Sequence, residues 1–151
     1  MADTLWIVTA NAARARFYER RADGSLAEIA DLVHPESRQS GRDLASDRAG
    51  RSELSLGDQK RGRTAYEPPT SVHEKEHERF AREVAAQLDA GVAGGRCQAL
   101  VLLVAPAFLG ELRQRLGDAT AKAVRVSEAV DLTALPPHDL RPRVDALLRP
   151  R

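Results

Sequence analysis

The chain has 151 residues, of which 42% are hydrophobic, so we expect one domain over residues 1–151 and no second one. With 23 Lys and Arg against 22 Asp and Glu, the formal charge of +1 excludes binding of nucleic acid through overall positive charge. The one cysteine, Cys97, excludes an internal disulfide and a cysteine-based metal site. It favours a cytoplasmic setting, and without a visible signal peptide or long apolar run we expect no membrane partner.

Three strands are expected at the front of the chain, over Thr4 to Thr9, Arg14 to Arg20 and Leu26 to Val33. The Asp23-Gly24 pair between the second and the third is typical of a hairpin turn. The pattern therefore predicts an antiparallel meander. The residues expected on its apolar face are Trp6, Phe17, Ile29 and Leu32 or their neighbours, because the pattern does not fix the register.

A polar stretch, Pro35 to Ser71, comes after the meander and is rich in Arg, Gly, Ser and Asp. Its length of roughly 37 residues is far beyond that of an ordinary connection in a compact domain. The sequence therefore predicts a mobile loop over residues 35–71, which serves either as a functional arm or as a disordered linker.

A long helix is expected to begin at Ser71, because Ser71 and Glu74 have the spacing of a capping box, and to end at Gly91. Helical periodicity places a single apolar stripe on the side of His77. The members of that stripe are Phe80, Ala81, Val84 and Leu88.

The second half of the chain alternates strands and helices. The expected elements are a strand over Leu100 to Val104, a helix over Pro106 to Leu116, a strand over Lys122 to Val126 and a helix from Pro136 to about Leu148. Strands that alternate with helices imply parallel crossovers. The fold class predicted is α/β, a mixed five-stranded sheet of ribonuclease H-like topology (βββαβαβα).

One motif suggests metal chemistry. His73-Glu74-Lys75-Glu76-His77 has the His-Glu-x-x-His spacing of zinc peptidases. The middle positions are charged, and no third ligand stands at a familiar distance. The segment is therefore interpreted as a charged first helical turn, with no metal and no cofactor.

Enzymes of ribonuclease H-like topology hold two metals with strand and helix carboxylates. Here Asp3 precedes the first strand, and no Asp or Glu lies between Leu100 and Ala105. Cys97 has no nearby catalytic partner, and no Gly-x-Ser-x-Gly elbow occurs. We therefore expect a protein that is not an enzyme.

The polar loop is the candidate site for RNA or another polyanion. Seven basic residues face six acidic ones, so the loop has a net charge of about +1 and a solvated, self-paired loop is the alternative. The candidate anion-binding residues are Arg38, Arg42, Arg48, Arg51, Lys60, Arg61 and Arg63. Lys60 to Arg63 is the best phosphate-facing cluster, because Gly62 permits close approach of the backbone.

Several fragments in order resemble the bacterial host-attachment proteins, a family named for a role in attachment to host cells. They are Trp6 to Asn11, Ala15 to Tyr18, Phe80 to Ala85, Leu102 to Gly110 and Asp131 to Leu140. That family in turn is similar to the central domain of archaeal and eukaryotic class-one peptide-chain release factors. Those proteins carry a catalytic Gly-Gly-Gln tripeptide in the loop that corresponds to 35–71, and this sequence lacks the tripeptide. Peptidyl-tRNA hydrolysis is therefore not implied.

These patterns leave three functional hypotheses. The first is a non-catalytic, cytoplasmic protein that associates with RNA or the ribosome through its Arg/Gly-rich loop. The second is a protein-interaction module whose loop folds on a protein partner. The third is a zinc hydrolase that uses His73, Glu74 and His77.

Overall fold

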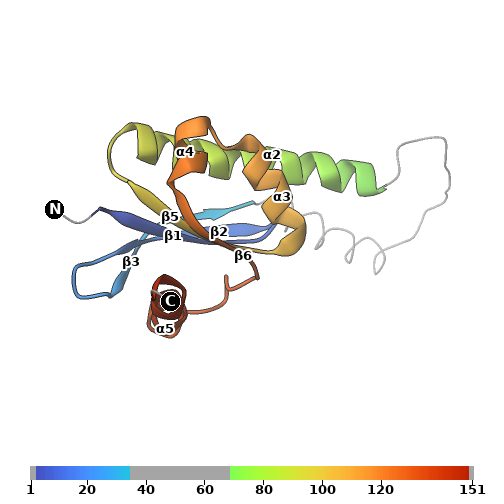
Figure 1. The fold of residues 1–151 in the computed structure, drawn as a ribbon. Helices are drawn as coiled ribbons and strands as arrows, with labels where there is room; N and C mark the ends of the chain where they lie inside the picture. The colour runs from blue at the N-terminus through green and yellow to red at the C-terminus, as the bar shows by residue number, and fades with distance from the viewer. Residues whose placement is uncertain (1–2, 35–68, 150–151) are drawn as a thin grey trace, which may run out of the picture.

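The computed structural model describes residues 3–34 and 69–149, which form a mixed sheet with helices on both faces (Figure 1). The strands are β1 (Leu5–Ala10), β2 (Arg14–Arg20), β3 (Leu26–Val33), β5 (Ala99–Val104) and β6 (Val124–Ala129). The helices are α2 (Pro69–Ala93), α3 (Pro106–Arg115), α4 (Asp118–Ala123) and α5 (Pro137–Leu148). The predicted mobile loop falls mostly on residues 35–68, which lie outside the described part of the chain.

The five strands have the order β3-β2-β1-β5-β6. β1 pairs antiparallel with β2 and parallel with β5, and β6 continues the parallel half. This is the ribonuclease H-like arrangement, so the predicted fold class is confirmed. The predicted meander is confirmed as well, because β2 also pairs antiparallel with β3.

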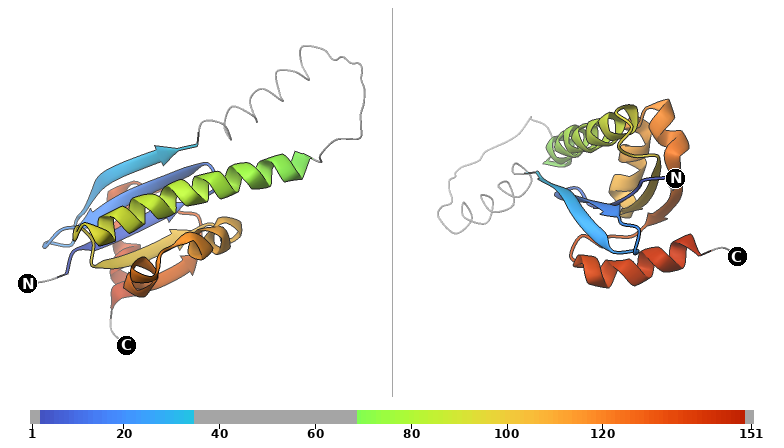
Figure 2. Two further views of the ribbon diagram at one scale, coloured as in Figure 1. Left: turned by 90° about the horizontal axis from the view of Figure 1, so that it is seen from above. Right: turned by 90° about the vertical axis from the view of Figure 1, so that its left-hand side faces the viewer.

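The sheet separates two layers of helices. Figure 2 shows α2, α3 and α4 over one face and α5 under the other. All the residues of β1 and β5 are buried, and successive side chains enter the two cores in turn. In β1, Trp6 and Val8 join the core beneath α2, whereas Leu5 and Ile7 join the core above α5. A strand that is covered on both faces has a continuous run of apolar residues in its sequence, and Leu5 to Val8 form such a run.

The apolar stripe predicted for the long helix is confirmed, because Phe80, Ala81, Val84 and Leu88 of α2 are fully buried. The predicted ends of the helix are wrong. α2 begins at Pro69, so Ser71 lies within its first turn, and it continues past Gly91 to Ala93. Gly91 is buried against the indole ring of Trp6, so it permits close packing and does not end the helix.

Two further expectations are corrected. Ile29, expected on the buried face, is 40% exposed, because the pairing of β2 with β3 shifts between Phe17 and Tyr18 and leaves Ile29 without a partner in the register. The strand expected from Lys122 begins only at Val124, after the short helix α4. The side chain of Asp89 on α2 accepts hydrogen bonds from the Gly117 backbone nitrogen and the Thr120 hydroxyl, and so stabilises the first turn of α4.

Gly91→Ala should lower the free energy of unfolding by about 1–3 kcal/mol, because the added Cβ would lie 2.5 Å from Cζ3 of Trp6 and force the ring to move. Gly110→Ala on α3 is the matched control. Nothing lies within 4 Å of its added Cβ, so the better helix propensity should stabilise the protein by about 0.5–1 kcal/mol. Urea denaturation of both variants measures the difference. Equal effects of the two substitutions would contradict the packing role of Gly91.

Candidate functional site

The residues that the sequence proposes for RNA or anion contact lie outside the described part of the chain. They are Arg38, Arg42, Arg48, Arg51, Lys60, Arg61 and Arg63. The structure does place the two junctions of this segment with the body. These are His34, which comes directly after β3, and Pro69, the first residue of α2. We call the end of the sheet where β1 and β5 finish, near these junctions, the carboxyl edge.

His34 fixes the junction after β3 to the body. Its backbone nitrogen donates to the carbonyl oxygen of Ala13 at 2.9 Å, and its ring, only 2% exposed, stacks on Phe80 of α2 with centroids 5.2 Å apart. Phe80 in turn contacts Phe108 of α3, with ring centroids 5.7 Å apart. The segment therefore leaves the body from a position held by both the β1–β2 turn and α2. His34 therefore has a structural role at this junction.

Asn11 organises the turn that joins β1 to β2. Its side-chain oxygen accepts hydrogen bonds from the backbone nitrogens of Ala13 at 2.8 Å and Arg14 at 2.9 Å. Its side-chain nitrogen donates to Asp131 at 2.9 Å and to the Thr133 hydroxyl at 3.2 Å. One amide therefore stabilises a local turn and holds the loop after β6 against it.

Asp131 is held as a hydrogen-bond acceptor. Besides the Asn11 amide it accepts from the backbone nitrogen of Thr133 at 3.0 Å and from its hydroxyl at 2.7 Å. Partial burial raises the pKa of Asp131, but the hydrogen bonds from Asn11 and Thr133 outweigh it and the net pKa is lowered. These contacts stabilise the ionised form and direct both carboxylate oxygens at the protein itself.

The arginines of β2 are also engaged within the protein. Arg16 donates to both oxygens of Glu28, at 2.9 and 3.2 Å, and a third bond at 3.0 Å reaches the carbonyl oxygen of Thr133. Arg14 donates to Asp31 at 3.0 and 2.7 Å, and this lowers the pKa of Asp31. These bidentate pairs connect β2 with β3, and each carboxylate offsets the charge of its guanidinium.

A cavity of about 340 Å³ opens at the carboxyl edge, where β1 and β5 end. In open α/β sheets, ligands bind outside the carboxyl ends of the strands, at the point where the connections from two neighbouring strands leave in opposite directions. The lining is mainly apolar, with alanines from both turns and Phe108, and its polar members are Asn11 and the half-buried His77. Because Asn11 is already saturated, His77 is the side chain there that has hydrogen-bonding capacity left for a ligand.

The zinc motif is described only in part. His77 lines the cavity at the carboxyl edge, whereas the side chains of His73 and Glu74 lie outside the described residues. Within the described ranges, no three His, Cys, Asp or Glu side chains gather as metal ligands would. The hypothesis of a zinc hydrolase therefore gains no support from geometry.

The central strands carry apolar side chains where a two-metal nuclease would need carboxylates. β1 and β5 contain no Asp or Glu, and Asp3 before β1 pairs with Arg125 at 3.5 Å. Cys97 is buried, its thiol donates to the carbonyl oxygen of Ala99 at 3.3 Å, and burial raises its pKa to about 11. A thiol in this state is a poor nucleophile at neutral pH.

Sequence reasoning missed the network around Asn11, Asp131, Thr133 and Arg16. The hydrogen bond between Asp131 and Thr133 could have been predicted from the sequence. Asp131-Leu132-Thr133 has the spacing at which an aspartate side chain accepts a hydrogen bond from the backbone nitrogen two residues later. The contact between Asn11 and Asp131 spans most of the chain, and no periodicity encodes it.

The strand order and this edge define an α/β protein of ribonuclease H-like topology. A family described as "Protein required for attachment to host cells" has a sequence model that matches residues 6–144, and the chain belongs to that family. No curated protein matches the sequence. Among the helices of the described ranges, none has the length and apolarity to cross a bilayer.

Asn11→Ala should raise the pKa of Asp131, because it removes a hydrogen bond to the ionised carboxylate. A carboxyl group whose pKa is lower in the folded state than in the unfolded state stabilises the protein at pH values above its unfolded-state pKa of about 3.9. This contribution to stability is lost as the pH falls through the folded-state pKa. The variant should therefore lose stability at neutral pH and show a weaker acid dependence.

NMR titration of the side-chain carboxyl carbons measures this change. Asp23 is the internal control, because Ser25 lowers its pKa in the distant turn between β2 and β3. An unchanged Asp131 pKa, or an equal shift at Asp23, would contradict the role given to Asn11.

Proposed function

We propose that this member of the host-attachment family is a non-enzymatic, cytoplasmic binding protein that contacts RNA, in the setting of the ribosome, through residues 35–68. The observation that carries the proposal is the position of this segment. It joins β3 to α2 at the carboxyl edge of a ribonuclease H-like sheet, and one junction is fixed by His34. The resemblance to class-one release factors that the sequence suggests is part of this proposal, because their central domain carries its ribosome-entering loop between the third strand and the first long helix.

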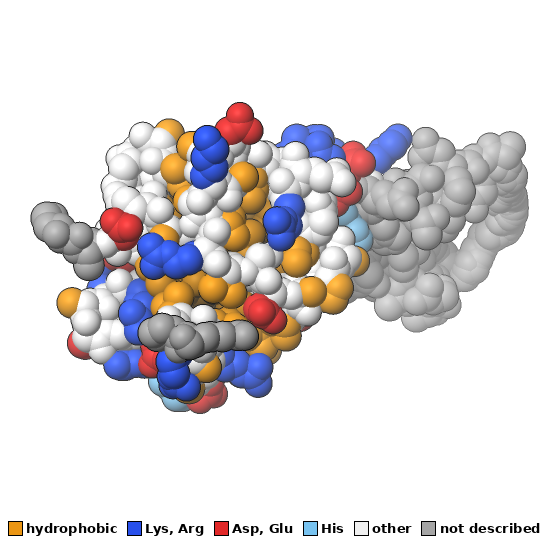
Figure 3. Space-filling view, viewed as in Figure 1, with side chains coloured by type: hydrophobic (Ala, Val, Ile, Leu, Met, Phe, Trp, Pro, Cys, Tyr) orange, Lys and Arg blue, Asp and Glu red, His pale blue; other side chains and the backbone are white. Residues whose placement is uncertain are grey.

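The charges of the described residues support a contact made by the segment. Arg14 and Arg16 are neutralised by Asp31 and Glu28, and Arg20 pairs with Asp145 at 2.8 Å. On the face in Figure 3, Lys and Arg side chains are scattered among acidic and apolar ones. A local basic cluster such as Lys60-Arg61-Gly62-Arg63 is then the better candidate for binding phosphate.

The chemistry proposed is binding without hydrolysis. The segment lacks Gly-Gly-Gln, and β1 and β5 carry no carboxylate. Asp131 is directed at Asn11 and Thr133. The family description concerns attachment to host cells, which under this proposal is an indirect consequence of a role in RNA binding.

Exposed apolar side chains on β3 favour a second candidate, a protein partner. Ile29 is 40% exposed and Val33 is 36% exposed, on an outer strand of the sheet that leads directly into the segment. An outer strand with exposed backbone groups can pair with an extended peptide. Binding that persists after nuclease treatment and at high salt would favour this candidate over RNA.

Replacing Arg42, Lys60, Arg61 and Arg63 by Ala should remove the protein from ribosomal fractions in sedimentation at low salt, because these side chains would neutralise phosphates. The control replaces Arg113, Arg125, Arg143 and Arg149, which are exposed body arginines, and so changes the net charge equally. The wild type and the control should co-sediment, and the association should weaken as salt rises.

Circular dichroism of both variants checks that they fold. Absence of the wild-type protein from ribosomal fractions at low salt would overturn the proposal. Equal loss in both variants would show that charge in general, and not the segment, causes the association.

A further inference from the structure

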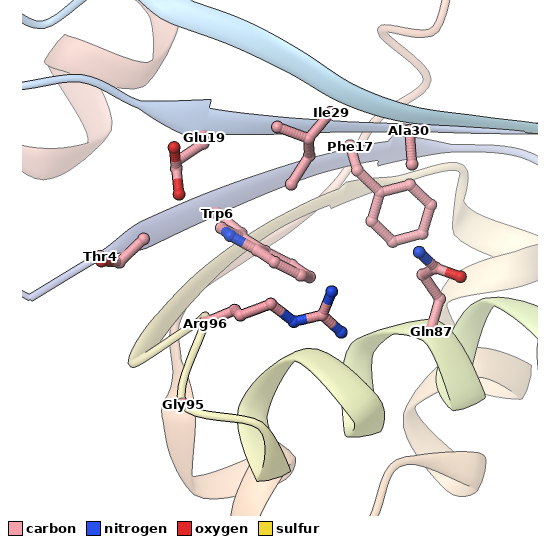
Figure 4. Close-up of a pocket in the computed structure, with 9 residues that line it drawn as sticks. All are labelled: Thr4, Trp6, Phe17, Glu19, Ile29, Ala30, Gln87, Gly95 and Arg96. Atoms are coloured by element: carbon pink, nitrogen blue, oxygen red, sulfur yellow. The ribbon is translucent and has the colours of Figure 1, made fainter.

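A second cavity lies at the opposite end of the sheet from the carboxyl edge, beside the first residues of β1. It has a volume of about 370 Å³ and lies between the last turns of α2 and the strands β1, β2 and β3 (Figure 4). We call it the Trp6 pocket. Its lining residues belong to the body, so a ligand bound in this pocket is independent of the proposed RNA contact.

One wall of the Trp6 pocket is aromatic and apolar. Trp6 is 4% exposed and Phe17 is fully buried, and Figure 4 shows both rings on the side of the sheet that faces α2. Ile29 completes this wall, and it is exposed because the irregular pairing of β2 with β3 leaves it out of the register. A flat apolar group placed here would cover Ile29 and stack near two rings.

Three side chains around the Trp6 pocket, namely Trp6, Gln87 and the exposed Arg96, carry hydrogen-bond donors that have no protein acceptor among the described residues. The indole nitrogen of Trp6 is buried and has no hydrogen-bond partner, although a buried donor of this kind is normally paired. Among the described residues, neither the Gln87 amide nor the Arg96 guanidinium has a hydrogen-bond or ion-pair partner. In Figure 4 the Arg96 side chain extends beneath Trp6 toward Gln87.

Glu19 limits the charge of a ligand. Its carboxylate lies at the end of β2 beside Trp6, and only one of its oxygens accepts a bond from Arg21. A second negative group on a ligand would be repelled by Glu19, whereas a single carboxylate can reach Arg96 on the other side.

We propose that the Trp6 pocket binds a small aromatic monocarboxylate. The ring of the ligand lies against Trp6, Phe17 and Ile29. Its carboxylate accepts hydrogen bonds from the Arg96 guanidinium and the Gln87 amide, and charge-assisted bonds of this type are the stronger ones. The pocket has the size and the few convergent polar groups that small-molecule sites share.

The protein contains a single tryptophan, so its fluorescence reports directly on the pocket. Titration of the full chain with 3-phenylpropionate should change the Trp6 emission saturably, with a Kd of about 0.1–1 mM. The neutral 3-phenylpropanamide and the ringless propionate should each bind at least about tenfold more weakly. No saturable change with 3-phenylpropionate, or equal binding of the amide, would overturn the proposal.

Two pairs of variants test the contacts. Arg96→Gln should weaken binding of 3-phenylpropionate about tenfold, whereas Arg113→Gln, an exposed arginine on α3, should leave it unchanged. Ile29→Ser should weaken binding severalfold, whereas Val33→Ser, on the same strand but outside the pocket, should not. Unchanged binding in Arg96→Gln and Ile29→Ser, with folding confirmed by circular dichroism, would place the ligand elsewhere and overturn the proposal.

Discussion

Burial of β1 on both faces is the constraint on which the rest of the structure depends. Every residue of β1 is buried, and the strand lies between the antiparallel β2 and the parallel β5. Its alternate side chains enter two separate cores, one beneath α2 and one above α5. A strand of this kind requires helices on both faces of the sheet, and α2, α3 and α4 cover one face while α5 covers the other (Figure 2).

The two ends of β1 have different chemistry. At the carboxyl edge, Asn11, Asp131 and Thr133 hydrogen-bond to one another and join the loops there. At the start of the strand, within the described part of the chain, Trp6 and Arg96 keep donors without partners. The hydrogen bonds at the carboxyl edge hold loops in place, and the segment proposed to contact RNA leaves the body at this edge. The second end offers free hydrogen-bonding capacity to a small molecule.

The sequence predicts much of this fold, because periodicity and turn chemistry are local. The stripe of α2 and the turn at Gly24, whose φ is +88°, were both readable. The end of α2 could not be predicted from the sequence, because a glycine such as Gly91 is typical of a helix end. Only the structure shows that Gly91 packs against Trp6 inside the helix. The contact between Asn11 and Asp131 was hidden for the same reason, since it depends on residues far apart in the chain. The basic residues were named from the sequence, but composition does not encode their partner.

The central claim is that an ordered α/β body carries a segment that binds RNA. Ultraviolet crosslinking in living cells, followed by mass spectrometry of the crosslinked peptides, tests this claim most directly. We predict that RNA crosslinks fall within residues 35–68, with the basic cluster from Lys60 to Arg63 among them. Crosslinks confined to the body, for example to α5, or no crosslinks at all, would contradict it.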